Sequence, residues 1–95
     1  MSAEKELQTK IIRYLKSKKC YVIKTKPGVG VPVGCPDIIF MLEGFWGGIE
    51  TKKGPKAPFQ PLQKETLAKM HSWSWAKSVN PTNWDMIRDE LEIIL

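Results

Sequence analysis

Histidine and cysteine are scarce in this 95-residue sequence, which contains one histidine, His71, and two cysteines, Cys20 and Cys35. A structural zinc site needs four ligands, usually Cys and His at short spacings, and no such set is present. Small secreted domains that depend on disulfides normally carry several pairs of cysteines. We therefore expect two reduced thiols in a cytoplasmic protein, with no zinc site and no organic cofactor.

Long apolar runs and a secretory leader are also missing. No segment approaches the roughly 20 apolar residues of a membrane span, and no leader pattern opens the chain, so we expect no membrane contact. A hydrophobic content of 42% is typical of a globular chain. Residues 1–95 are predicted to form a single domain, and association into a dimer would help its small core.

Acidic residues are absent from residues 7–36, although this stretch contains seven Lys or Arg residues. The whole chain has a formal net charge of +5. A local basic block suits a polyanionic partner such as nucleic acid. A solvated, lysine-rich helix face has the same composition, so charge alone leaves both interpretations open.

Hydrophobic periodicity predicts an α/β domain. Leu7, Ile11 and Leu15 recur at helical spacing behind a possible cap at Ser2, and the dipeptide Asn80-Pro81 is typical of a helix start. The expected helices cover residues 3–18, 61–70 and 80 onward, and the expected strands cover residues 20–26, 37–42, 47–53 and 73–79. This order of helix, three strands, helix, strand and helix indicates a central mixed four-stranded sheet flanked by helices.

The most informative residues are Asp37, Glu50 and Lys52, each at the start of or within an apolar run. Because side chains alternate along a strand, Glu50 and Lys52 share one face and Thr51 takes the other. Asp37 joins that face only if paired residue numbers on the two strands sum to an odd value. A two-residue turn at Gly44-Phe45 meets this condition, with Asp37 opposite Lys52 and Glu50 as its diagonal neighbour.

A third acid, Glu4, lies on the same helical stripe as Leu7, Gln8 and Ile11. This stripe is expected to face the interior, so Glu4 at its end is aimed toward the sheet. The alternative, that Glu4 only complements the positive end of the helix dipole, remains open.

Carboxylates close to a lysine predict a site for a divalent cation and a phosphate. Hard oxygen ligands favour Mg²⁺ or Mn²⁺, which can polarise a phosphoryl oxygen while the lysine holds a water molecule. A salt bridge between Glu50 and Lys52 is the alternative, and Glu-x-Lys alone is weak evidence. Preceded by Gly-x-Pro-Asp at residues 34–37 in a small basic chain, the pattern favours phosphodiester hydrolysis.

With these motifs, the chain resembles the virus-type replication–repair nuclease (VRR-Nuc) domains of the PD-(D/E)XK nuclease superfamily over nearly its whole length. Members open with a helix bearing Glu and, four residues later, Gln, here Glu4 and Gln8. They continue with Gly-x-Pro-Asp, Glu-x-Lys and Pro-x-Gln, here residues 34–37, 50–52 and 61–63. The resemblance implies the restriction-endonuclease-like fold of that superfamily. Thr51 replaces a common Val, and we expect its side chain to point away from the site.

The resemblance also implies a catalytic set that binds metal, serves the attacking water and completes the site. That set consists of Asp37, Glu50, Lys52, Glu4 and Gln63. Asp37 and Glu50 bind the metal, the Thr51 carbonyl adds an oxygen, and Lys52 serves the water. We interpret four lysines that flank the site as DNA phosphate contacts, against the alternative that they only add surface charge. These lysines are Lys24, Lys26, Lys53 and Lys56.

The sequence thus predicts a structure-selective DNA endonuclease that depends on Mg²⁺ or Mn²⁺ and acts as a homodimer. Similar stand-alone family members come from phages and act on branched DNA, including four-way (Holliday) junctions, which implies a phage or prophage source in a bacterial host. A nuclease for flaps or single-strand ends is one alternative. A non-catalytic, basic nucleic-acid-binding module is another, although it has no need for two converging acids that repel phosphate.

Overall fold

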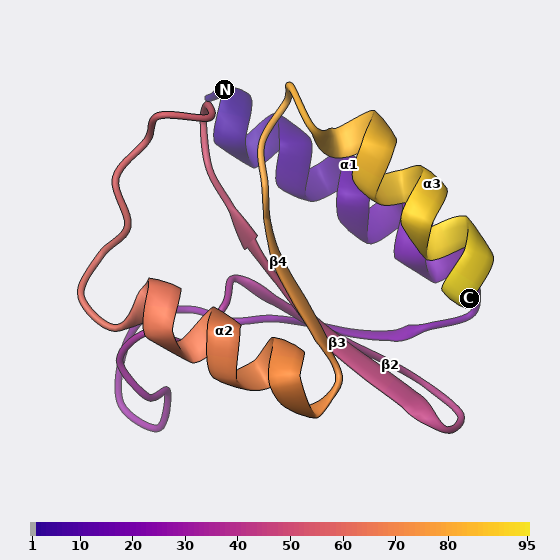
Figure 1. Cartoon of the computed structure of the whole chain (residues 1–95), viewed down its shortest axis with the longest axis horizontal. Helices are drawn as coiled ribbons and strands as arrows, with labels where there is room; N and C mark the ends of the chain where they lie inside the picture. Colours follow the sequence, from indigo (N-terminus) through magenta and orange to yellow (C-terminus); the bar gives the residue numbers. More distant parts are fainter. Residues whose placement is uncertain (1) are drawn as a thin grey trace.

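The computed structural model describes residues 2–95 and has the expected order of three helices and four strands (Figure 1). The elements are α1 (Ala3–Ser17), β1 (Tyr21–Lys24), β2 (Ile38–Leu42), β3 (Phe45–Thr51), α2 (Gln63–Trp73), β4 (Trp75–Val79) and α3 (Trp84–Ile94). The prediction of an α/β domain with a mixed four-stranded sheet is confirmed.

The strands lie in the order β1-β2-β3-β4. The first three pair antiparallel, and β3 pairs parallel with β4 through the crossover helix α2. Figure 1 shows α1 and α3 side by side over one face of the sheet and α2 on the other. The Tyr14 and Trp84 rings join α1 to α3 in an edge-to-face contact with centroids 5.6 Å apart.

The main core lies between the sheet and the α1–α3 pair. Ser2 caps helix α1, because its hydroxyl accepts a hydrogen bond from the Lys5 N–H at 3.2 Å. The helix buries its apolar stripe in this core. The fully buried core side chains come from both layers, namely Ile11, Leu15, Ile38, Phe40, Ile49, Val79 and Leu91. Helix α2 buries only Leu67. None of the helices within residues 2–95 combines the length and apolar character needed to cross a bilayer.

The β2–β3 hairpin differs from the expected register by two residues. Leu42 pairs with Phe45 and Ile38 with Ile49, so the turn is Glu43-Gly44 rather than Gly44-Phe45. Gly44 adopts φ 79°, which suits the second central position of a tight turn. The paired numbers still sum to an odd value, so the predicted sharing of a face is retained. Continuing the register places Asp37 opposite Glu50 instead of Lys52.

Both later helices start after the predicted residue. Pro61 is not the first residue of α2, because Leu62 precedes the helix in the left-handed conformation at φ 69°. Asn80 instead opens a turn, in which its side chain accepts hydrogen bonds from the Thr82 and Asn83 N–H groups at 2.8 and 3.0 Å, and α3 begins only at Trp84. Strands β1, β2 and β4 are shorter than expected, whereas β3 has the expected length but begins and ends two residues earlier.

The approach of β3 to the core requires glycine at position 47. A Cβ atom there would lie 2.5 Å from Cζ of the buried Phe40 ring and 3.0 Å from the Trp75 carbonyl oxygen. We predict that Gly47→Ala lowers the free energy of unfolding by about 1–3 kcal/mol, as overpacking of a core does. Urea denaturation measures this loss.

Gly54→Ala is the matched control, because a Cβ at Gly54 meets no atom within 4 Å. It should change stability by no more than about 0.5 kcal/mol. Equal losses in the two variants would contradict the packing argument.

Candidate active site

Five of the predicted catalytic residues line one open pocket of about 350 Å³, together with Lys53. They are Glu4, Asp37, Glu50, Lys52 and Gln63. The pocket lies where the carboxyl end of β3 meets the amino-terminal end of α1, and these two ends are adjacent in Figure 1. The loop between β3 and α2 closes the opposite side with Pro58 and Gln60.

Asp37 is held by Thr51. Oδ2 of Asp37 accepts hydrogen bonds from the Thr51 backbone N–H at 2.9 Å and from the Thr51 hydroxyl at 2.7 Å. The same hydroxyl accepts a hydrogen bond from Nε2 of buried Gln8 on α1, at 2.7 Å. Both hydrogen bonds donated to Asp37 within the described chain therefore go to one oxygen, which leaves Oδ1 for another ligand.

Glu50 is buried with one carboxylate oxygen unpaired. The residue is 2% exposed, and Oε2 accepts a hydrogen bond from the Gln63 side-chain amide at 2.9 Å. Oε1 is buried and has no hydrogen-bond partner among the described residues. Burial, followed by the nearby carboxylate of Asp37, raises the pKa of Glu50 to about 7. A buried carboxylate in this state is one that a cation would stabilise.

Lys52 is oriented by the loop and by α2. Its ammonium group donates hydrogen bonds to the Pro58 carbonyl at 3.0 Å and to Oε1 of Gln63 at 2.8 Å, and it lies 3.7 Å from Oε2 of Glu50. It also lies 4.8 Å from the centre of the Phe59 ring. An ammonium has three donors, so one N–H remains for a ligand beside the two acids.

The acids form a pair rather than a three-carboxylate cluster. Across residues 2–95, no group of three or more His, Cys, Asp or Glu side chains is placed to hold a metal ion. Glu4 lines the pocket and contributes to the raised pKa of Glu50 without joining such a group. Asp37 and Glu50 are therefore the side chains that could bind a divalent cation. Two carboxylates fit Mg²⁺, which keeps several waters and takes further oxygens from substrate phosphate.

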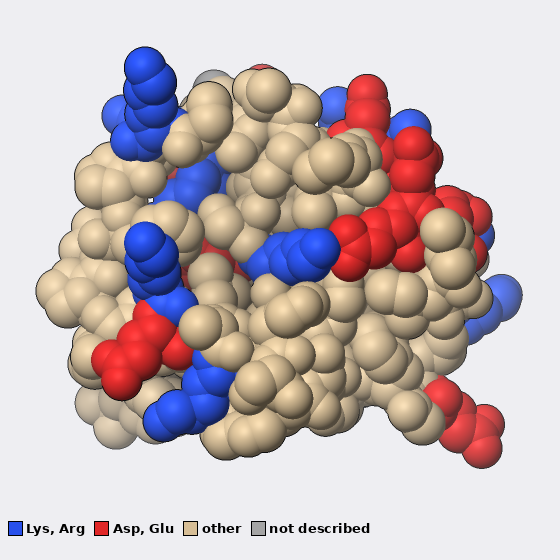
Figure 2. Space-filling view, viewed as in Figure 1, with Lys and Arg blue, Asp and Glu red and all other residues tan. Residues whose placement is uncertain are grey.

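The predicted DNA-binding lysines divide into two groups. Lys53 lines the pocket, whereas Lys24, Lys26 and Lys56 are exposed outside its lining. Figure 2 shows that the acidic side chains of this face gather mainly over α3. Most of the charged side chains over α2 and the preceding loop are basic. The acidic and basic side chains of this face are thus largely separated.

Sequence reasoning missed the role of the Thr51 side chain. It lies on the opposite face of β3 from Glu50, as predicted, but it does not point away from the site. Asp37 lies just beyond the last β2–β3 pair, Ile38 with Ile49, where its carboxylate reaches the Thr51 N–H and hydroxyl together. The alternation of side chains between the two faces of a sheet predicts their direction only where both strands are paired.

Gln8 and Gln60 were also missed as site residues. Gln8 is the buried donor to Thr51, and the Gln60 N–H donates to Oε1 of Gln63 at 2.7 Å. The signal for Gln8 was present, because it lies on the inward stripe of α1 four residues after Glu4. Nothing in the sequence indicated the contact from Gln60.

Comparison of the chain with protein-family models, with curated proteins and with solved structures gave no match. The sequence motifs and the geometry of the pocket are therefore the observations that bear on the function of this chain.

The Thr51 hydroxyl is predicted to stabilise the site through two hydrogen bonds. Thr51→Val keeps the shape of the side chain but removes the donor to Asp37 and leaves the buried amide of Gln8 unpaired. We expect the free energy of unfolding to fall by about 1–3 kcal/mol. Thr82→Val is the control, because Thr82 is exposed and its hydroxyl makes no hydrogen bond within the described chain. Equal effects of the two variants would argue against the network.

The raised pKa of Glu50 predicts that the free energy of unfolding of the metal-free protein depends on pH. An acid that titrates at about 7 when folded and at 4.5 when unfolded binds its proton more tightly in the folded state. Its ionisation therefore lowers stability progressively as pH rises from about 4.5 to about 7, and the full cost persists above that range. Glu50→Gln removes this titration.

Urea denaturation in EDTA between pH 4 and 8 tests this expectation. The stability of Glu50→Gln relative to the wild type should rise across this window and then level off. Glu43→Gln, at the exposed β2–β3 turn, should show no such rise. A constant difference between Glu50→Gln and the wild type across the range would refute the assignment.

Proposed function

We propose that this protein is a metal-dependent, structure-selective DNA endonuclease with a PD-(D/E)XK fold of the VRR-Nuc type. The observation that carries the proposal is the unpaired Oε1 of buried Glu50 beside the carboxylate of Asp37. A binding module gains nothing from two such acids, because they repel phosphate and destabilise the fold. A divalent cation held by the same pair would supply positive charge that attracts a phosphodiester.

The chain's own groups suit phosphodiester hydrolysis. Asp37 and Glu50 would hold Mg²⁺ or Mn²⁺, with the Thr51 carbonyl as a further oxygen ligand. When bound, the ion supplies polarisation of a phosphoryl oxygen and lowers the pKa of a nearby water. The free N–H of Lys52 holds and orients the attacking water and offsets negative charge that develops on the phosphate.

Gln63 positions the lysine and the acid together. Its amide oxygen accepts hydrogen bonds from Lys52 and from the Gln60 N–H, while its amide nitrogen donates to Glu50. This arrangement also fixes which end of the Gln63 amide faces which partner. Glu4, at the pocket edge, adds negative charge that favours cation binding.

Branched DNA such as a four-way junction is the proposed substrate, and a homodimer is the proposed form. A C₂ pair places two equivalent sites on symmetry-related strands, as cleavage of a junction requires. Lys24, Lys26, Lys53 and Lys56 are proposed to contact phosphates. By the family resemblance, we propose cytoplasmic action in a bacterial host, from a phage or prophage gene.

Cleavage of labelled DNA tests the activity and the residue roles. We expect cutting with Mg²⁺ or Mn²⁺ and none in EDTA. Asp37→Asn, Glu50→Gln and Lys52→Met should each reduce kcat about 100-fold or more, the scale of losing one group that stabilises a transition state. A panel of junction, flap, single-stranded and duplex DNA identifies the preferred shape.

Lys53→Met is the matched control for Lys52→Met, because the two lysines are adjacent and only Lys52 contacts Gln63. It should weaken binding several-fold and lower the salt dependence by about one phosphate contact. A thermal-shift titration with Mn²⁺ gives a readout besides activity. Added Mn²⁺ should raise the Tm of the wild type but not that of Glu50→Gln. Cleavage that survives Asp37→Asn or Glu50→Gln would defeat the site assignment, and metal-independent binding without cutting would favour the non-catalytic module.

A further inference from the structure

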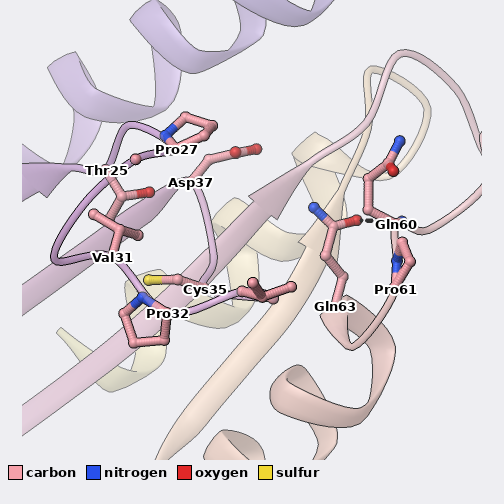
Figure 3. Close-up of a pocket in the computed structure, with 12 residues that line it drawn as sticks. Thr25, Pro27, Val31, Pro32, Cys35, Asp37, Gln60, Pro61 and Gln63 are labelled. Atoms are coloured by element: carbon pink, nitrogen blue, oxygen red, sulfur yellow. Dashed lines mark hydrogen bonds between the residues drawn. The ribbon is translucent and has the colours of Figure 1, made fainter.

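A second pocket of about 360 Å³ adjoins the candidate active site. It shares Asp37, Gln60 and Gln63 with the active-site pocket, so the two cavities meet along these residues. Figure 3 shows the loop between β1 and β2 on one side of it and the turn before α2 on the other. The volume lies in the range of about 300–1,000 Å³ that is usual for small-molecule sites.

The walls of this pocket suit an uncharged, flat group. The β1–β2 loop contributes Pro27, Val31 and Pro32, and the opposite wall contributes Pro61 (Figure 3). No Lys or Arg is among the residues that line it, and the carboxylate of Asp37 stands at its boundary. A phosphate would be repelled there, whereas a heterocyclic base could lie against the apolar surfaces.

The two walls are held together by a tight contact. Gly34 adopts φ 88°, and a Cβ there would lie 2.8 Å from the Leu62 carbonyl oxygen. Leu62 itself adopts φ 69°, a conformation that costs a non-glycine residue free energy and that persists at ligand sites when packing enforces it. The Cys35 N–H also donates to the Pro32 carbonyl at 3.2 Å, which supports the loop. The β1–β2 loop and the turn before α2 therefore approach each other closely beside the cavity.

The side-chain amide of Gln60 is available to recognise a ligand in this pocket, in addition to Oδ1 of Asp37. The Gln60 side-chain amide makes no hydrogen bond within the described chain, whereas Gln63 uses both ends of its amide on Lys52, Glu50 and the Gln60 N–H. A free amide offers donors and an acceptor together, as the edge of a nucleobase does. It stands at the boundary between this cavity and the active-site pocket.

We propose that this second pocket receives one unpaired nucleobase of the DNA strand whose phosphate occupies the active-site pocket. The inference rests on the proposed function for that neighbouring phosphate. Phosphate contacts position a strand but carry no direct information about its bases. Extruding a base costs a few kcal/mol in intact duplex and least where the base is already unpaired. Occupation of the pocket would thus select branch points, flaps and gaps over continuous duplex.

Binding of two matched DNA probes tests the proposal without requiring cleavage. One probe is a duplex with a single unpaired adenine, and the other carries an abasic residue at the same position. Measured with Ca²⁺ in place of Mg²⁺, the wild-type protein should bind the adenine probe about tenfold more tightly, equivalent to roughly 1.4 kcal/mol. Equal Kd values for the two probes would overturn the proposal.

Two tryptophan variants on the same loop locate the effect. Val31→Trp fills the pocket and should abolish the difference between the probes, while Val29→Trp, at a fully exposed position outside the lining, should preserve it. Preserved discrimination in Val31→Trp would contradict the assigned position. Should the wild-type protein cut no DNA yet distinguish the probes, the nuclease proposal fails and the base pocket stands.

Alkylation of Cys35 provides a second readout that needs no variant. Cys35 lines the pocket, and buried Cys20 serves as an internal reference. The adenine probe should slow modification of Cys35 more than the abasic probe does, as followed by mass spectrometry. Equal protection by both probes would show that the base lies elsewhere.

Discussion

The link between Asp37 and Thr51 organises the end of the molecule that carries the candidate site. It joins β2 to β3 just beyond the point where their ladder ends, and through the Thr51 hydroxyl it reaches Gln8 on α1. Three elements are thereby fixed around one carboxylate. Because both hydrogen bonds go to Oδ2, the network positions Asp37 firmly while the other oxygen remains available. The same residue also separates the two adjoining pockets.

Glu50 shows how function and stability oppose each other here. Its burial beside a second acid raises its pKa, and one oxygen lacks any partner within the described chain. A buried carboxylate without a full set of partners lowers the free energy of unfolding. The loss matters in a small domain, in which α2 buries only Leu67. The contacts from Gln63 and Lys52 offset only part of this cost. If Glu50 binds the proposed divalent cation, metal binding would raise folding stability through the same carboxylate.

Much of the architecture and part of the candidate site could be predicted from local pattern. The stripe of Leu7, Ile11 and Leu15 identified α1. The alternation of Glu50 and Lys52 placed both on one side of the third strand, and they line the same pocket although β3 ends at Thr51. The predicted β2–β3 register was wrong by two residues, because Gly44 takes the second central position of the turn rather than the first. The predicted start of α2 was wrong because Leu62 takes the left-handed conformation just before the helix. Leu62 is packed there against Gly34, which lies 28 positions earlier in the chain.

Residue types and their spacing were sufficient to predict the α/β order and to select Asp37, Glu50 and Lys52, which the structure brings into one pocket. Both predictions depend on periodicity along a few residues. Periodicity could not predict three other features. These are the orientation of Thr51 toward Asp37, the unpaired oxygen of Glu50 and the cavity lined by Gly34. Each depends on packing between segments far apart in the chain. Burial and hydrogen-bond partners are properties of that packing, and they determine the pKa of Glu50 and the shape of both pockets.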